Sequence, residues 1–132
     1  MLARVPRGIA LWALMAGLLS CDLPTAPLPD GAVPFAPNPQ LTAIWWRQVE
    51  ECSGRRGDLA RIRFYIVPQA QSFEWESVDA IGLWMERGNR IVLASEFAFR
   101  DRNVRHEMLH ALIRLPGHPP EFFKVRCGAL VD

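Results

Sequence analysis

The chain contains little histidine, cysteine or tyrosine: three, three and one among its 132 residues. No C-x-x-C pair occurs, which excludes a dithiol redox enzyme. The charge is nearly balanced, with 15 Lys and Arg against 14 Asp and Glu. The charge therefore gives no reason to expect a nucleic-acid partner. The longest apolar run, residues 9–19, is too short for the roughly 20 residues of a membrane-spanning helix. A length of 132 residues is enough for one modest globular domain and too short for two, so we expect a single domain.

The N-terminal residues 1–20 have the composition of an export signal, with two arginines before the apolar run. The sequence Leu18-Leu19-Ser20-Cys21 resembles the lipobox of bacterial lipoproteins. This resemblance implies cleavage before Cys21, a lipid on Cys21, and anchoring of the exported protein to a membrane of the bacterial cell envelope. An ordinary or uncleaved signal is the alternative. Cleavage removes two arginines and no acid, so the mature charge becomes 13 − 14 = −1.

Residues 21–39 are rich in proline and show no apolar periodicity. Such a segment is extended and weakly ordered. We therefore expect a Pro-rich tether at 21–39, followed by a single folded domain at 40–132.

The two remaining cysteines form one even pair. Export into an oxidising compartment allows thiols to pair, and a lipid on the first cysteine leaves only Cys52 and Cys127. We predict a Cys52–Cys127 disulfide, with two buried free thiols as the alternative.

The first predicted helix follows the tether. Asn38 can cap its N-terminus, Pro39 suits its first turn, and Gly54 can end it. Its core-facing side is expected to carry the apolar residues Leu41, Ile44, Trp45, Val49 and Cys52.

Strand patterns follow this helix. Ile62, Phe64 and Ile66 alternate with polar residues, which predicts a half-buried strand. Residues 87–89, Arg-Gly-Asn, separate two apolar runs and predict a β-hairpin. Residues 71–77 fit no element. The expected fold class is α+β, with a small antiparallel sheet of three to four strands.

The spacing becomes helical after Ser95. Ser95 or Asp101 can cap the second helix, and Pro116 with the next glycine can end it. The residues expected to face the core are Val104, Met108, Leu109 and Leu112. The scattered arginines, including Arg105 on this helix, are expected on solvated faces.

All three histidines lie within this helix and the loop after it. His106 and His110 are four residues apart, so their imidazoles stack on one side and can direct nitrogens at one metal ion, about 2 Å from each. Glu107 projects beside them, where a carboxylate can take a proton from a metal-bound water. The pattern is H-E-x-x-H, and it predicts one Zn²⁺ per chain.

A catalytic zinc needs a third protein ligand and one open position. We predict His118, because Pro116 can turn the chain back toward the metal and Pro119 favours an extended backbone at His118. Glu121 and Asp132 are the alternatives for this role.

The stretch His106-Glu107-Met108-Leu109-His110 resembles the signature of the zincin metallopeptidases. The resemblance covers the hairpin, the helix and the following loop, roughly a third of the chain. It implies a zincin-like domain in which the strand before the helix, residues 89–95, pairs with an extended substrate. The spacing from His110 to His118 departs from the metzincin pattern, and little chain remains for a downstream gluzincin glutamate. The resemblance therefore implies a minimal zincin-like peptidase with three histidine ligands.

The activity implied by this resemblance is that of a zinc metalloendopeptidase acting on a peptide or protein substrate. Zinc-bound water, activated by Glu107, attacks the peptide bond, and Glu107 passes the proton to the leaving amine. The donor to the oxyanion stays open between Tyr65 and an arginine. The alternatives are a lipid-anchored metal-binding or assembly protein without turnover, and hydrolysis of a non-peptide amide.

Overall fold

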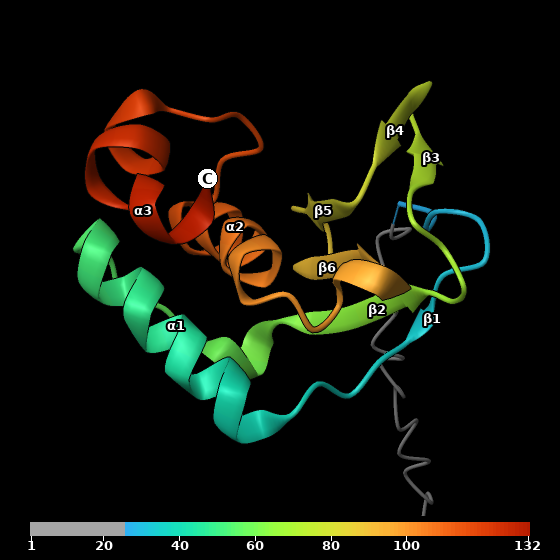
Figure 1. Ribbon diagram of the computed structural model, residues 1–132, viewed down its shortest axis with the longest axis horizontal. Coiled ribbons are helices and arrows are strands. Elements are labelled where there is room, and N and C mark those ends of the chain that lie inside the picture. The colour runs from blue at the N-terminus through green and yellow to red at the C-terminus, as the bar shows by residue number, and fades with distance from the viewer. Residues whose placement is uncertain (1–25) are drawn as a thin grey trace, which may run out of the picture.

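The computed structural model describes residues 26–132, so the expected signal peptide and the lipid site at Cys21 lie outside the described residues. The chain forms a mixed α+β fold (Figure 1). Its elements in chain order are β1 (Val33–Pro34), α1 (Pro39–Ser53), η1 (Leu59–Arg61), β2 (Arg63–Val67), β3 (Phe73–Trp75), β4 (Val78–Ala80), β5 (Gly82–Met85), β6 (Arg90–Ala94), η2 (Ser95–Phe97), α2 (Asp101–Ile113), the π-helical turn η3 (Glu121–Arg126) and α3 (Gly128–Val131).

The main sheet has four strands in the order β1-β2-β6-β5. The predicted hairpin is confirmed, because β5 and β6 pair antiparallel around the turn at residues 86–89. The prediction of an antiparallel sheet is wrong for its centre, where β2 and β6 run parallel with Arg63 opposite Arg90. Three other strands, β3, β4 and β5, lie between β2 and β6 in the sequence. The alternation of apolar residues predicts each strand but not which distant strand it pairs with, so the parallel pairing could not be predicted.

The segment at residues 71–77 forms most of a second hairpin, β3–β4, which is a separate two-stranded sheet (Figure 1). Its turn residues Glu76 and Ser77 both have positive φ, 49° and 67°. Two successive positive φ values are typical of a type I′ hairpin turn, which usually contains asparagine or glycine. Because neither residue occurs here, the turn could not be identified from the sequence.

The boundaries of α1 agree with the prediction. The Asn38 side chain accepts hydrogen bonds from the backbone N–H groups of Gln40 and Leu41, both at 3.0 Å, and Gly54 ends the helix with φ of 70°. The predicted inner face is wrong in part, since Leu41 and Ile44 are exposed. The buried residues are Thr42, Trp46, Val49 and Ser53. Thr42 can be buried because its hydroxyl donates to the Asn38 carbonyl at 2.8 Å. A prediction based only on apolar residues does not include it.

Helix α2 packs against β5 and β6 on one face of the sheet, and α1 and α3 pack against α2. The opposite face packs against the β3–β4 hairpin and the N-terminal segment. In that segment, where only a tether was expected, β1 pairs antiparallel with β2. The buried Arg90 side chain also donates to the Ala26 carbonyl at 2.7 Å. The ordered fold therefore includes residues before the expected start near Pro39. Across residues 26–132, no helix combines the length and apolar character needed to cross a bilayer.

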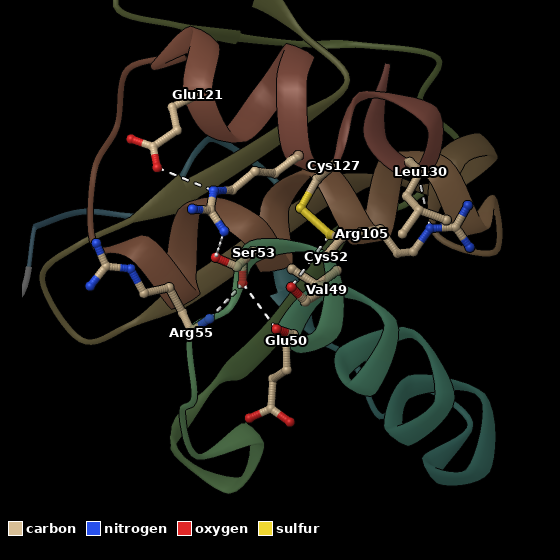
Figure 2. Close-up of a disulfide and its surroundings, with 10 residues drawn as sticks. Val49, Glu50, Cys52, Ser53, Arg55, Arg105, Glu121, Cys127 and Leu130 are labelled. Atoms are coloured by element: carbon tan, nitrogen blue, oxygen red, sulfur yellow. Dashed lines mark hydrogen bonds and ion pairs between the residues drawn. A yellow bond between two sulfur atoms is a disulfide. The ribbon is translucent and has the colours of Figure 1, made fainter.

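The predicted Cys52–Cys127 disulfide is present, with 5.2 Å between the two Cα atoms (Figure 2). It joins the last turn of α1 to the residue before α3. Beside it, the Arg105 guanidinium donates to the Leu130 carbonyl at 2.9 Å and to the Asp101 carboxylate at the same distance. Arg105 is buried, so its expected position on a solvated face is wrong. The arginine and the disulfide together attach the end of the chain to both long helices.

Candidate metal centre

Helix α2 positions the first two histidines. The residues expected to face the core are all buried: Val104, Met108, Leu109 and Leu112. The expected caps are wrong, because Arg100 is the capping residue and makes no side-chain cap hydrogen bond. The helix ends at Ile113, just before the expected stop at Pro116, and its C-cap residue Arg114 has a φ of 60°. This left-handed residue turns the backbone before Pro116, so the next loop passes back across the histidine face.

The three histidines come together as predicted. The His106 Nε2 atom lies 2.9 Å from the His118 Nε2 atom, and the His110 Nε2 atom lies 3.3 Å from it. One ligand nitrogen from each ring lies within 4.8 Å of the others. Three nitrogens held at 2.0–2.1 Å from a tetrahedral zinc are about 3.3 Å apart. The spacing of the imidazoles is therefore that of a metal-binding group.

Backbone carbonyls fix the orientation of the two helix histidines. His106 Nδ1 lies 3.1 Å from the Val131 carbonyl oxygen, and His110 Nδ1 lies 2.7 Å from the Leu115 carbonyl oxygen. A carbonyl can only accept, so these contacts assign the proton to each Nδ1 and leave each Nε2 lone pair free. Carbonyl partners of this kind set the tautomer and ring orientation of metal-ligating histidines.

The environment favours neutral imidazoles. Burial lowers the pKa of His110 to about 4, although the Leu115 carbonyl opposes this effect. Burial also lowers the pKa of His106, which the Val131 carbonyl opposes. Metal binding requires the neutral ring, so neither helix histidine has to lose a proton at neutral pH before it can bind.

Phe123 packs against all three imidazoles. Its ring centroid lies 5.0 Å from that of His106, 4.6 Å from that of His110 and 4.7 Å from that of His118. Phe123 is 2% exposed, so it fills the space behind the rings. The sequence analysis did not identify Phe123. It lies in η3 and contacts the histidines because the C-terminal segment packs against α2, which no local sequence pattern indicates.

The alternative third ligands do not join the group. Glu121 pairs with the Arg126 guanidinium at 3.1 Å. The charge of Asp132 raises the pKa of His106, against the larger lowering effect of burial. Among the described residues, the potential metal group consists of His106, His110 and His118.

Glu107 is buried between α2 and β5, and 7% of its surface is exposed. Burial raises the pKa of Glu107 to about 8, while a hydrogen bond from the backbone N–H of Trp84 opposes the rise. The carboxylate also lies close to Gly82, where an added Cβ atom would be 2.5 Å from Glu107 Oε1. Glu107 thus lies against a strand edge, in a setting that allows it to hold a proton near neutral pH.

Glu107 and the histidines line one cleft of about 410 Å³. Asn103 of α2 and residues 79–84, from the end of β4 through β5, line it as well. The strand expected to pair with substrate, residues 89–95, is central and pairs with β2 and β5, so that expectation is wrong. Tyr65 packs on the opposite face of the sheet and does not line the cleft.

The edge strand at the cleft is β5. The Ala94 N–H donates to the Ile81 carbonyl at 2.9 Å, so Ile81 and Ala94 form a hydrogen-bonded pair of the antiparallel ladder between β5 and β6. Alternate residues of such a ladder direct their N–H and C=O groups outward, so those of Gly82 and Trp84 point away from β6. Within residues 26–132, no strand pairs with this outer edge.

Comparisons with protein-family models, curated proteins and solved structures found no match to this chain. The chemistry of the cleft therefore depends on its own residues. They provide three convergent imidazoles, one buried carboxyl group and the outward backbone groups of Gly82 on a strand edge.

Proposed function

We propose that this protein is a zinc-dependent peptidase of the cell envelope. The observation that carries the proposal is the convergence of three imidazole Nε2 atoms, 2.9 and 3.3 Å apart along His106-His118-His110, in the cleft that Glu107 lines. The H-E-x-x-H pattern and its resemblance to the zincin signature support the same activity.

Zinc fits these residues. Three neutral imidazoles are a common donor set for catalytic zinc, and they leave a fourth coordination position open. His106, His110 and His118 would hold the ion. When bound, zinc would supply a Lewis acid that polarises a carbonyl group and makes water more acidic.

Glu107 would move the proton. The carboxylate form of Glu107 would accept a proton from the attacking water, and the carboxylic acid so formed would deliver it to the leaving amine. Such transfer contributes most when the pKa of the group lies near the working pH. The backbone N–H of Trp84 stabilises the carboxylate form after delivery.

The outer edge of β5 at Gly82, which no described strand covers, favours a peptide substrate over another amide. The outward carbonyl and N–H groups of Gly82 can pair with an extended backbone, which would lie along the cleft as an added strand. A small non-peptide amide makes no use of this edge.

The test measures zinc content and cleavage of a quenched fluorogenic peptide library by the full-length protein in detergent. We expect one zinc per chain in the parent and in Glu107→Gln, with activity about 10³-fold lower in that variant. His118→Ala should bind zinc more weakly. Glu121→Gln, which changes an exposed carboxylate outside the group, is the matched control and should behave as the parent does.

Zinc without cleavage of any peptide would favour a metal-binding or assembly protein. Absence of zinc would show that the motif does not act as a metal site.

The proposed location is a membrane of the envelope, reached through a lipid on Cys21. Since Ala26 is bound by Arg90, only four residues separate the lipidated cysteine from the fold. Five residue steps span about 18 Å at most, so the domain would lie close to the bilayer and not on a long spacer. Metabolic labelling with radioactive palmitate should label the parent and not Cys21→Ser. Equal labelling of both proteins would refute the anchor.

A further inference from the structure

Gly82 is the first residue of β5, and its backbone gives no reason for glycine. Its φ lies outside the left-handed range, unlike those of Gly31, Gly54 and Gly88. Glycine weakens a strand, because it has no side chain to pack and loses more entropy on folding than other residues. Glycine inside a strand often marks a place where another group approaches closely.

At Gly82 the approaching group is the Glu107 side chain. A Cβ atom at position 82 would lie 2.5 Å from Oε1, 3.0 Å from Cγ and 3.1 Å from Cδ of Glu107. Ordinary contacts begin at 3.4 Å, so the carboxylate would have to move by about 0.9 Å, from 3.4 − 2.5. All three contacts are with one side chain, so the Glu107 side chain occupies the space that a methyl group at position 82 would need.

The space for such a movement is limited on two sides. The strand edge lies on one side, and the backbone N–H of Trp84 interacts with the carboxylate there. The helix that carries Glu107 is fixed by Met108 and Leu109, which are both fully buried. Displacement away from β5 would therefore shift the carboxylate into the cleft, toward the histidines.

We propose that Gly82 is a positioning residue for Glu107. Its lack of a side chain lets the carboxylate lie against the outer edge of β5, and this contact sets the distance between the proton-transferring group and the three histidines. The catalytic part of this inference rests on the proposed peptidase function. The contact itself does not, so the two can be tested separately.

The contact is tested by a stability cycle on the metal-free full-length protein. Thermal unfolding is measured for the parent, Gly82→Ala, Glu107→Ala and the double variant. We expect Gly82→Ala to lower Tm by on the order of 5 °C in the parent, as overpacking does, and to leave it unchanged or raise it when Glu107 is absent. An equal effect in both backgrounds would overturn the contact, whether or not the protein is an enzyme.

Positioning is tested by zinc content and by kcat and KM on the fluorogenic peptide library. Gly82→Ala should keep one zinc per chain and an unchanged KM, while kcat falls about 100-fold, as misplacement by about 1 Å can cause. Gly117→Ala is the matched control, because a methyl group there meets nothing within 4 Å. A higher KM with unchanged kcat would assign Gly82 to substrate binding, and loss of zinc would assign it to metal support; either result overturns the proposal. A parent without peptidase activity would refute the proposed function, and the stability cycle would still decide the contact.

Discussion

Removal of the Cys52–Cys127 disulfide should weaken both the fold and the metal site. The disulfide joins residues 75 positions apart, and closure of a loop of that length stabilises the folded state by about 4 kcal/mol in the chain-entropy treatment. For a domain near 100 residues, each kcal/mol shifts Tm by roughly 4–8 °C, so the Cys52→Ala/Cys127→Ala variant should melt on the order of 20 °C lower.

The effect on zinc follows from what lies on either side of Cys127. The Val131 carbonyl that orients His106 follows it in α3, and the Phe123 ring that packs on all three imidazoles precedes it in η3. Loss of an orienting partner typically costs 10–100-fold in metal affinity. We therefore expect the double variant to bind zinc about 10-fold to 100-fold more weakly.

The assay is a competition titration against a chromophoric zinc chelator, carried out below the melting temperature of both proteins so that only folded chains are compared. Cys21→Ser controls for the loss of a cysteine that lies outside the described residues. A double variant whose Tm falls while its zinc affinity stays within twofold of the parent would refute the link between the disulfide and the metal. An unchanged Tm would refute the stability calculation itself.

Two further perturbations test the buried charges. In metal-free protein the raised pKa of Glu107, about 8, means that the folded state holds more protons than the unfolded state above pH 4.5, so stability should fall by about 2 kcal/mol from pH 6.5 to pH 8. The lowered pKa of His110, about 4, acts in the opposite sense and lets stability rise with pH between about 4 and 6.5. Urea unfolding across this range should show the fall above pH 6.5 in the parent and not in Glu107→Gln. Arg90→Met should destabilise the fold by about 1–3 kcal/mol, because the buried Ala26 contact is lost, and should expose the N-terminal segment to limited proteolysis. The exposed Arg63→Met is its control, and equal effects of the two substitutions would contradict a specific role for Arg90.

Local chemistry made the boundaries of α1 and the positions of the helix histidines predictable. Asn38, Pro39 and Gly54 each act within a few residues of the backbone groups that they satisfy, so they set the limits of α1. The four-residue spacing of His106 and His110 places both rings on one side of α2 for the same reason.

Features that depend on distant parts of the chain could not be predicted. The parallel pairing of β2 with β6 depends on where the intervening strands pack, and the two-sided burial of β6 follows from it. Phe123 and the Val131 carbonyl reach the histidines only because the disulfide and Arg105 attach the chain's end to both helices. Glu107 on α2 contacts Gly82 on β5, and no pattern in the sequence indicates that these two distant residues are neighbours.

The two proposed functions of the cleft, metal binding and proton transfer, depend on different parts of the fold. The histidines depend on the chain after α2, through the Leu115 and Val131 carbonyls and the Phe123 ring. Glu107 depends on the sheet, through the edge of β5. Substitutions in the C-terminal segment should therefore change metal affinity first, and substitutions in β5 should change turnover with the metal retained. The two effects are separable because the two helix histidines and Glu107 all lie on α2, but the C-terminal segment orients the histidines and β5 contacts Glu107.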